Sequence, residues 1–229
     1  MSVWAIVVAA GRGERFGAPD DGTTLPRKQF VELAGTSVVT RAARAAHAAC
    51  EGVVLVLPAD VVADSPGIAD GVEVDAVVAG GATRAESVRA GLAAVPTGTE
   101  IVVVHDAARP LASPELFVRV IDAVRNGAAA AVPGLPVTDT VKRVAGDHVE
   151  ATVPRERLVT VQTPQAFRAD VLVAAHRGAP DASDDAALVE QAGGRVTVVP
   201  GDPRNLKITA PFDLVVADAL VREVEGTPR

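Results

Sequence analysis

Short apolar runs alternate with longer amphipathic stretches along most of the chain. The apolar runs are rich in Val, Ile and Ala and are bounded by Gly, Pro or Asp, which is typical of strands buried on both faces. The longer stretches are predicted to be helices. The pattern predicts strands at 3–9, 53–57, 74–78, 100–104, 128–132 and 196–199, and helices at 36–49, 83–95, 113–126 and 211–224.

Local signals support the predicted helices. Thr83 and Glu86 form a Thr-x-x-Glu capping box. Ser113 can cap the next helix, with Pro114 in its first turn and Gly127 as its stop. Strands that alternate with helices in this way indicate an α/β fold: a mostly parallel, twisted sheet with helices on both faces. The site is then expected at the carboxyl ends of the strands.

One segment departs from this alternation. Two stretches of alternating apolar and polar residues, 138–144 and 148–153, flank Ala145-Gly146-Asp147, as in a β-hairpin. An isolated hairpin is only marginally stable in water, so we expect it to lie against a second subunit. The organisation expected is one domain over residues 1–229, with the arm 136–156 inserted in it.

Composition narrows the classes of function. The chain has 22 Lys+Arg against 29 Asp+Glu, a net charge of −7, which disfavours a broad nucleic-acid surface but allows a local basic pocket. The single cysteine, Cys50, excludes an intramolecular disulfide and a cysteine-based zinc cluster. The apolar run 3–10 is too short to span a bilayer. We therefore expect a cytoplasmic protein with neither a membrane nor a nucleic acid as partner.

A glycine-rich loop, Ala9-Ala10-Gly11-Arg12-Gly13-Glu14-Arg15-Phe16-Gly17, follows the first predicted strand. Glycines let backbone N–H groups approach a phosphate, and Arg15 adds a positive charge. A Walker A loop would end in Gly-Lys-Ser/Thr, and a dinucleotide fingerprint would open directly into a helix. Neither occurs here. The loop is interpreted as binding a nucleoside triphosphate, with Lys28 as a second cation; a plain strand-to-loop turn is the simpler alternative.

A second glycine motif, Gly80-Gly81-Ala82-Thr83-Arg84, opens the helix predicted at 83–95. Backbone N–H groups at a helix N-terminus can bind an anion. Arg84 and Ser87 lie about one helical turn apart and could both reach it. A glycine turn with a capping box explains the same residues without a ligand.

A third motif, His105-Asp106-Ala107-Ala108-Arg109-Pro110, ends the strand predicted at 100–104. Asp106 can bind a metal or a ligand hydroxyl, and Arg109 can bind a phosphate. The two side chains could instead pair with each other. We expect His105 to be structural.

Taken in order, these motifs resemble the 2-C-methyl-D-erythritol 4-phosphate cytidylyltransferases of non-mevalonate isoprenoid synthesis. Each motif is weak alone, but the ordered set extends from the first strand to the last helix. Beyond the three motifs above, the matching segments are Pro26-Arg27-Lys28-Gln29, Asp139-Thr140-Val141-Lys142, Val153-Pro154-Arg155, Thr163-Pro164-Gln165, Asp184-Asp185-Ala186 and Asn205-Leu206-Lys207-Ile208-Thr209.

The resemblance implies a Rossmann-like nucleotidyltransferase fold and a homodimer joined through the hairpin arm. It also implies transfer of a cytidylyl group from CTP to the polyol phosphate, 2-C-methyl-D-erythritol 4-phosphate. The products would be 4-diphosphocytidyl-2-C-methyl-D-erythritol and pyrophosphate, with Mg²⁺ as cofactor.

Residue roles are implied position by position. Four cations match the family's catalytic residues: Arg15, Lys28, Arg155 (reaching over from the partner's arm) and Lys207. Nucleotide contacts are expected at Ala9, Ala10, Gly11, Gly13, Gly80, Gly81, Arg84, Ser87 and Ala107. Substrate contacts are expected at Asp106, Arg109, Thr140, Thr163 and Ser183, with Asp106 also a candidate metal ligand.

The chain departs from the family pattern in three places. Val8 stands where the family usually has Pro, and Ser183 stands where Thr is commoner, which keeps the hydroxyl. The segment before Lys28 carries an acidic insertion at 19–22, and Arg27 replaces the usual Pro.

Two other functions stay open. A ribitol 5-phosphate cytidylyltransferase shares the fold and many motifs, although the spelling Ala107-Ala108, where that group tends to Ser-Val, favours methylerythritol phosphate. A non-catalytic nucleotide-binding regulator is the second, but such a protein would need fewer cations than Arg15, Lys28 and Lys207.

Overall fold

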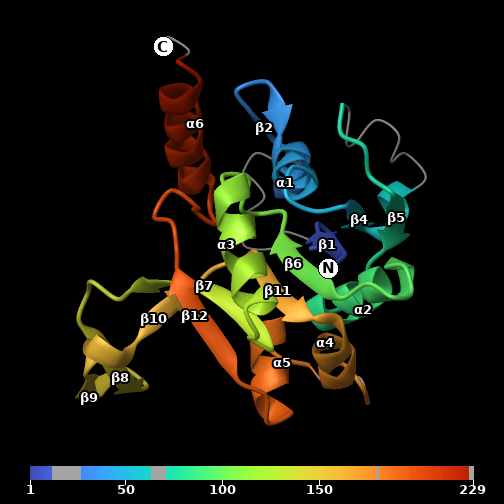
Figure 1. Ribbon diagram of the computed structural model, residues 1–229. Helices are drawn as coiled ribbons and strands as arrows, with labels where there is room; N and C mark the ends of the chain where they lie inside the picture. Colours follow the sequence, from blue (N-terminus) through green and yellow to red (C-terminus); the bar gives the residue numbers. More distant parts are fainter. Residues whose placement is uncertain (12–26, 63–70, 179–180, 227–229) are drawn as a thin grey trace.

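The computed structural model describes residues 1–11, 27–62, 71–178 and 181–226. Within these residues, eight strands form one central sheet, covered by helices on both faces (Figure 1). The strands are β1 (Val3–Val8), β4 (Gly52–Leu57), β5 (Ala76–Ala79), β6 (Ile101–Asp106), β7 (Ala130–Pro136), β10 (Val159–Val161), β11 (Gln165–Arg168) and β12 (Val196–Pro200). Their order is β10-β7-β11-β6-β1-β4-β5, and β12 pairs with β7.

Most neighbouring strands are parallel, which confirms the predicted mostly parallel α/β sheet. The parallel pairs are β1–β4, β1–β6, β4–β5 and β7–β12. The strands β10 and β11 run antiparallel to their neighbours. The alternation pattern did not predict these two, because each is short and Gln162-Thr163-Pro164 interrupts the apolar positions between them.

Successive residues of the central strands face opposite layers of helices. Val103 packs toward α1 and α3, whereas Val102 and Val104 pack toward α2, α4 and α5. This is the two-sided burial that continuous apolar strands predict. The helices are α1 (Val38–His47), α2 (Arg84–Ala94), α3 (Pro114–Arg125), α4 (Ala169–Ala175), α5 (Asp185–Gln191) and α6 (Pro211–Glu225).

The helix starts follow local capping chemistry. The side chains of Thr83 and Ser113 accept hydrogen bonds from backbone N–H groups in the first turns of α2 and α3, as predicted. The helix expected at 36–49 begins later, because Ser37 caps it after a short pair of strands, β2 (Glu32–Leu33) and β3 (Thr36–Ser37). The seven-residue α4 is too short to give a clear periodic signal. In the described residues, no helix combines the length and apolar character needed to cross a bilayer.

The C-terminal helix α6 stands at one edge of the molecule (Figure 1). It joins a small separate core in which Ile208 and Ala217 pack with Leu33 and Val38. The Asp213 carboxylate accepts hydrogen bonds from the backbone N–H groups before the helix. These contacts fix the segment leading into α6, which carries Lys207.

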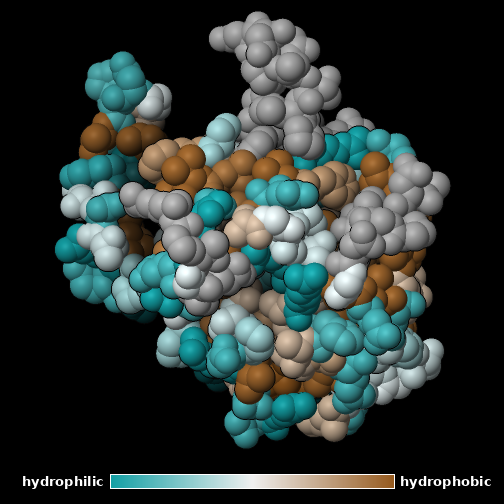
Figure 2. Space-filling view, turned by 90° about the horizontal axis from the view of Figure 1, so that it is seen from above, coloured by the Kyte–Doolittle hydropathy of each residue, from teal (hydrophilic) through white to brown (hydrophobic). Residues whose placement is uncertain are grey.

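The predicted hairpin is present as a two-stranded sheet of its own, formed by β8 (Val141–Ala145) and β9 (His148–Val153). Gly146 in its turn has φ of +57°, a conformation that favours glycine. The arm projects from the body at the left of both overall views (Figures 1 and 2). Val144 and Val149 are 58% and 60% exposed, so the arm presents apolar side chains to its surroundings.

Candidate functional site

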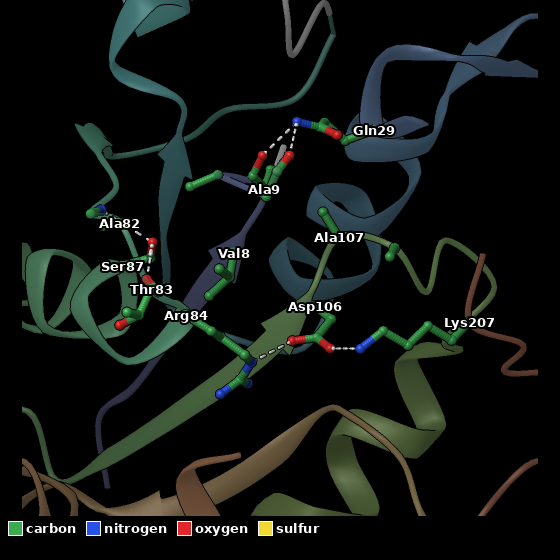
Figure 3. A pocket seen from close by; sticks show the side chains of 14 residues that line it. Val8, Ala9, Gln29, Ala82, Thr83, Arg84, Ser87, Asp106, Ala107 and Lys207 are labelled. Atoms are coloured by element: carbon green, nitrogen blue, oxygen red, sulfur yellow. Dashed lines mark hydrogen bonds and ion pairs between the residues drawn. The ribbon is translucent and has the colours of Figure 1, made fainter. Parts of the chain in front are cut away.

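A cavity of about 210 Å³ opens where β1 and β6 end, beside the start of α2 (Figure 3). The two strands are adjacent and parallel, with Val8 opposite Asp106. This is the edge of the sheet at which the sequence predicted the site. Nine of the expected site residues line the cavity: Ala9, Ala10, Gly11, Gly81, Arg84, Ser87, Asp106, Ala107 and Lys207.

Gly80 lets two of the loops approach each other. A Cβ atom at this position would lie 2.3 Å from the Cβ of Ala10 and 2.7 Å from the Oγ of Ser87. No real side chain tolerates such contacts, so glycine is required here on steric grounds. Gly80 therefore shapes the cavity from behind by letting Ala10 and Ser87 pack together.

Two backbone N–H groups of the turn that leads into α2 are already hydrogen-bonded within the protein. Ser87 Oγ accepts from the N–H of Gly81 at 3.2 Å, and Glu86 Oε2 accepts from the N–H of Ala82 at 2.6 Å. The glycine-turn and capping explanation therefore accounts for these amides. What this turn presents to the cavity is the guanidinium of Arg84.

The loop after β1 does offer backbone donors. Within the described part of the chain, the N–H groups of Ala10 and Gly11 meet no acceptor. Buried Gln29 holds this loop, because its Nε2 donates to the carbonyl oxygens of Ala9 at 2.9 Å and Gly11 at 3.1 Å (Figure 3). This role of Gln29 was not predicted, although the residue directly follows Lys28 in a matching motif.

A line of alternating charges crosses the floor of the cavity (Figure 3). The carboxylate of Asp106 receives Arg84 Nε at 3.0 Å on one oxygen and Lys207 Nζ at 2.7 Å on the other. The Asp106 side chain is 12% exposed, whereas that of Lys207 is 38% exposed. Lys207 therefore lies at the wetter end, where a ligand phosphate can reach it.

The two cations determine the ionisation of Asp106. Burial raises its pKa, but the charges of Arg84 and Lys207 outweigh burial and hold this pKa well below its usual range. Burial lowers the pKa of Arg84, and the neighbouring carboxylates more than compensate, so that the pKa lies above its ordinary value. The pKa shifts of Asp106 and Arg84 keep both groups charged at neutral pH.

A buried layer behind the cavity orients Arg84. Its Nη1 donates to Asp185 at 2.7 Å, and the second oxygen of Asp185 contacts His176 Nε2 at 3.0 Å. Asp184, not Asp185, caps α5. Two acids before an apolar stretch are typical of a helix start, yet one acid is enough for a cap. The second acid was the available signal for a buried partner.

Lys207 reaches the cavity because its neighbours are anchored. The N–H of Ile208 donates to the carbonyl of Ala108 at 2.7 Å, and the Ile208 side chain is fully buried. The Asn205 side chain donates to the carbonyl of Thr163 at 2.8 Å. The loop before α6 is thus joined to the loop after β6. Asp106 is the last residue of β6, directly before that loop.

His105 is structural, as expected. It is fully buried, with Nε2 3.1 Å from the Arg109 carbonyl and Nδ1 3.2 Å from Thr163 Oγ1. Burial lowers its pKa to about 4, so the ring is neutral. Thr163 Oγ1 also accepts the N–H of Asp106 at 3.0 Å. The Thr163 hydroxyl therefore positions the Asp106 backbone.

Arg109 does not pair with Asp106, which was one of the two alternatives. Its Nη1 donates to the carbonyl of Asn205 at 2.8 Å, and its Nη2 approaches the carbonyl of Val161 at 3.4 Å. Its Nε is buried without a partner among the described residues. In this structure the guanidinium joins three segments around the site.

Several expected site residues do not line the cavity. Thr140 and Arg155 lie on the arm and are exposed, and Arg155 donates to the carbonyl of Thr138 within the arm. Ser183 is exposed just before α5. Outside the described residues lie Gly13 and Arg15, together with the side chain of Lys28.

Comparison with known proteins agrees with this geometry. The family model for 2-C-methyl-D-erythritol 4-phosphate cytidylyltransferase matches residues 3–223. The protein of that name from Saccharopolyspora erythraea is 49% identical over 230 residues, covering 96% of this chain and 100% of the relative. A bifunctional enzyme from Nitratidesulfovibrio vulgaris is 44% identical, covering 96% of this chain and 58% of that enzyme.

Solved structures agree as well. The crystal structure of 2-C-methyl-D-erythritol 4-phosphate cytidylyltransferase from Thermus thermophilus has a TM-score of 0.77 and 36% identity, covering 97% of this chain and all of that one. The 4-diphosphocytidyl-2C-methyl-D-erythritol synthase from Anaerococcus prevotii has a TM-score of 0.81 at 29% identity and covers 96% of this chain. By fold, motifs and sequence, the chain belongs to the 2-C-methyl-D-erythritol 4-phosphate cytidylyltransferase family of nucleotidyltransferases.

Proposed function

We propose that the chain transfers a cytidylyl group from CTP to 2-C-methyl-D-erythritol 4-phosphate in isoprenoid precursor synthesis. One observation carries the proposal beyond family membership. Asp106, held between Arg84 and Lys207, lies at the edge of the cavity formed by β1 and β6, where Ala10 and Gly11 offer backbone donors. This arrangement suits two phosphorylated ligands that must meet.

The reaction needs no general base. The acceptor is a phosphate monoester, and because its second pKa is about 6, it is largely a dianion at neutral pH. An oxygen of this phosphate attacks the α-phosphorus of CTP. The bond from that phosphorus to the bridging β-phosphate oxygen breaks, and pyrophosphate leaves with the electron pair. The protein must hold two repelling anions in line and neutralise charge in the transition state.

The described residues divide that work. Lys207 lies at the exposed end of the line of charges, where it can meet a phosphate. Its ammonium group is paired with Asp106, which is also paired with Arg84. By family position, Arg15 and Lys28 supply further positive charge at the triphosphate. Each such transition-state contact is typically worth about 3–4 kcal/mol.

We also propose Mg²⁺ as the cofactor. Among the described residues, no group of three or more His, Cys, Asp or Glu is placed to hold a metal. Mg²⁺ in nucleotide enzymes is usually held by one or two carboxylates together with substrate phosphates. We propose Asp106 as the ligand of such an ion from the cavity lining, where its two oxygens also bind Arg84 and Lys207. When bound, the ion would neutralise phosphate charge.

The hairpin arm supports a proposal of a homodimer. Arg155 and Thr140 match substrate-binding positions of the family, yet both stand on the arm outside the cavity of their own chain. A partner's arm would bring its Arg155 to the acceptor phosphate, and the exposed Val144 and Val149 would be covered. We propose a cytoplasmic location, in keeping with the single cysteine.

The deciding experiment measures pyrophosphate release by the purified chain with CTP, Mg²⁺ and either methylerythritol phosphate or ribitol 5-phosphate. We expect turnover to be at least about tenfold faster with methylerythritol phosphate, a difference of about 1.4 kcal/mol. Faster turnover with ribitol 5-phosphate would reassign the acceptor. CTP binding without turnover on either acceptor would favour a non-catalytic regulator. Chelation by EDTA should stop turnover, and added Mg²⁺ should restore it.

A further inference from the structure

A second cavity, of about 520 Å³, shares no lining residue with the first. Its walls come from α1, from α6, from residues 110–114 at the start of α3, and from the segment that holds Asp202 and Arg204 (Figure 1). Pockets for small molecules typically measure about 300–1,000 Å³. The proposed reaction gives this cavity no role.

The lining is rich in arginine, although the whole chain is acidic. It contains Arg41, Arg44 and Arg204 against one carboxylate, Asp202, which accepts a hydrogen bond from the Arg204 backbone N–H. Arg41 is held in place, because its Nε and Nη2 donate to the carbonyl of Leu33 at 3.0 and 2.8 Å. Arginine is the side chain best suited to binding phosphate, through its planar set of donors.

The rest of the lining is largely apolar. Pro114, in the first turn of α3, also lines the cavity, and this positive end of the helix dipole favours an anion there. The apolar wall is formed by Ala45, Leu111, Ala112, Leu220 and Val221. A ligand that fits both parts carries a phosphate at one end and a hydrocarbon group at the other.

Two segments of this cavity continue directly into the active site. Leu111 follows Arg109 by two residues, and Arg204 precedes Lys207 by three. The segments are bonded to each other: Arg109 donates to the Asn205 carbonyl at 2.8 Å, and the N–H of Ile208 donates to the Ala108 carbonyl at 2.7 Å. A ligand in the second cavity therefore contacts the same two loops that place Asp106 and Lys207.

We infer that the second cavity binds a soluble phosphate ester with an apolar tail, and that its occupation changes the affinity of the active site for CTP. Because coupling between two binding sites is reciprocal, CTP must change the affinity of the second site by the same factor. The binding step does not depend on the proposed reaction, so the two proposals can fail separately.

The test uses octyl phosphate as the probe, titrated calorimetrically into the purified chain with CTP at saturation. We expect binding to the wild type and at least a tenfold loss of affinity in the double variant Arg44→Glu/Arg204→Glu. The matched control is Arg177→Glu/Arg195→Glu, which makes the same charge change at exposed positions outside the cavity lining and should bind as the wild type does. Octyl phosphate should also shift the Kd for CTP, measured calorimetrically, at least twofold in the wild type and the control only.

Several results would overturn the inference. Absent binding, or equal binding to the double variant, removes the site. Binding that saturating CTP abolishes would place octyl phosphate in the active site. Octanol binding as tightly as octyl phosphate would make the cavity merely apolar. A changed sedimentation coefficient for the double variant would assign this surface to contact between copies. An unchanged Kd for CTP would refute the coupling.

Discussion

The cavity at the end of the sheet and the hairpin arm differ in the exposure and pairing of their expected site residues. In the cavity, Asp106 is 12% exposed and is paired on both oxygens. On the arm, Thr140 and Arg155 are exposed, and the Arg155 guanidinium is bonded to the arm's own backbone. The first set is positioned within one chain, whereas the second lies outside the described cavity of its own chain.

The ion pairs of the cavity also determine its net charge. In the described cavity network, the two cations Arg84 and Lys207 face two carboxylates, Asp106 and Asp185. This network is close to neutral before any ligand arrives. The additional positive charge that two phosphorylated ligands require must then come from elsewhere, and Arg15, Lys28 and the arm's Arg155 are the residues the sequence offers.

The largest effect is expected at the exposed end of the cavity network. Lys207→Ala should lower kcat about a hundred- to a thousandfold, since one transition-state contact is lost. The fold should persist, because Asp106 keeps its bond to Arg84. Pyrophosphate release and urea unfolding check both points, with Arg195→Ala as the control. An unchanged kcat would break the contrast, because Lys207 would then not be a catalytic cation of the cavity.

The buried end of the same network should respond mainly in stability. The Asp185 side chain is 1% exposed, and removing one member of a buried pair typically costs about 3–5 kcal/mol. Asp185→Asn should therefore lower the free energy of unfolding by about 3 kcal/mol. It should also raise the KM for CTP about tenfold, with little change in kcat, since Arg84 loses its orientation.

Exposed Asp181→Asn is the matched control for this prediction. Unfolding in urea and steady-state kinetics are the measurements. A kcat that falls as far as KM rises would mean that Asp185 acts on the transition state directly, and its assignment as a positioning residue would be wrong.

The pH dependence of stability should come from a buried histidine of the body and not from the arm. Burial lowers the pKa of His105 from 6.5 to about 4. Between these values the unfolded chain binds the extra proton, so stability is complete above the unfolded pKa and is lost as the pH falls. Because of His105, the free energy of unfolding should fall by about 2 kcal/mol as the pH is lowered from about 7.5 to about 5.

Urea unfolding across that pH range is the measurement. His105→Asn should flatten the dependence, while His148→Gln, at an exposed position on the arm, should leave it as in the wild type. Equal slopes for wild type and His105→Asn would show that other groups cause the pH dependence.

The smallest expected effect is the activity recovered when two inactive variants are mixed, which tests whether the arm of one subunit acts in the site of another. Arg155→Ala and Lys28→Ala should each be nearly inactive alone. In an equal mixture, half of the dimers are hybrids with one intact site of two, so activity should recover to about a quarter of the wild type. Pyrophosphate release after subunit exchange, confirmed by mass spectrometry, measures this. Absent recovery would place Arg155 in its own chain's site and end the contrast.

Much of the fold was predictable from local patterns. Continuous apolar runs predicted the buried parallel strands, and the caps at Thr83 and Ser113 predicted two helix starts. The pattern missed β10, β11 and α4, which are short and owe their structure to neighbours. The predicted boundaries differ slightly from the observed ones. The strand predicted at 74–78, for example, is β5, which covers 76–79.

The site was predictable in kind but not in its contacts. Motifs predicted that Arg84, Asp106 and Lys207 belong to one site, and all three line the cavity. No local pattern indicated that Asp106 would join the other two, because Lys207 is 101 residues away along the chain. The supporting roles of Gln29 and Asp185 likewise arise from contacts between distant segments.

The order of amino acids was enough to establish the chemistry available to this protein: phosphate-binding loops, separated cations, a hairpin and a family resemblance. Side-chain type, apolar periodicity and capping are properties of neighbouring residues, so they can be read along the chain. Only the folded chain shows which charges neutralise one another, which arginine joins separate segments and where cavities remain. Those outcomes depend on the packing of segments far apart in sequence, where burial and distance set the strength of every charge interaction.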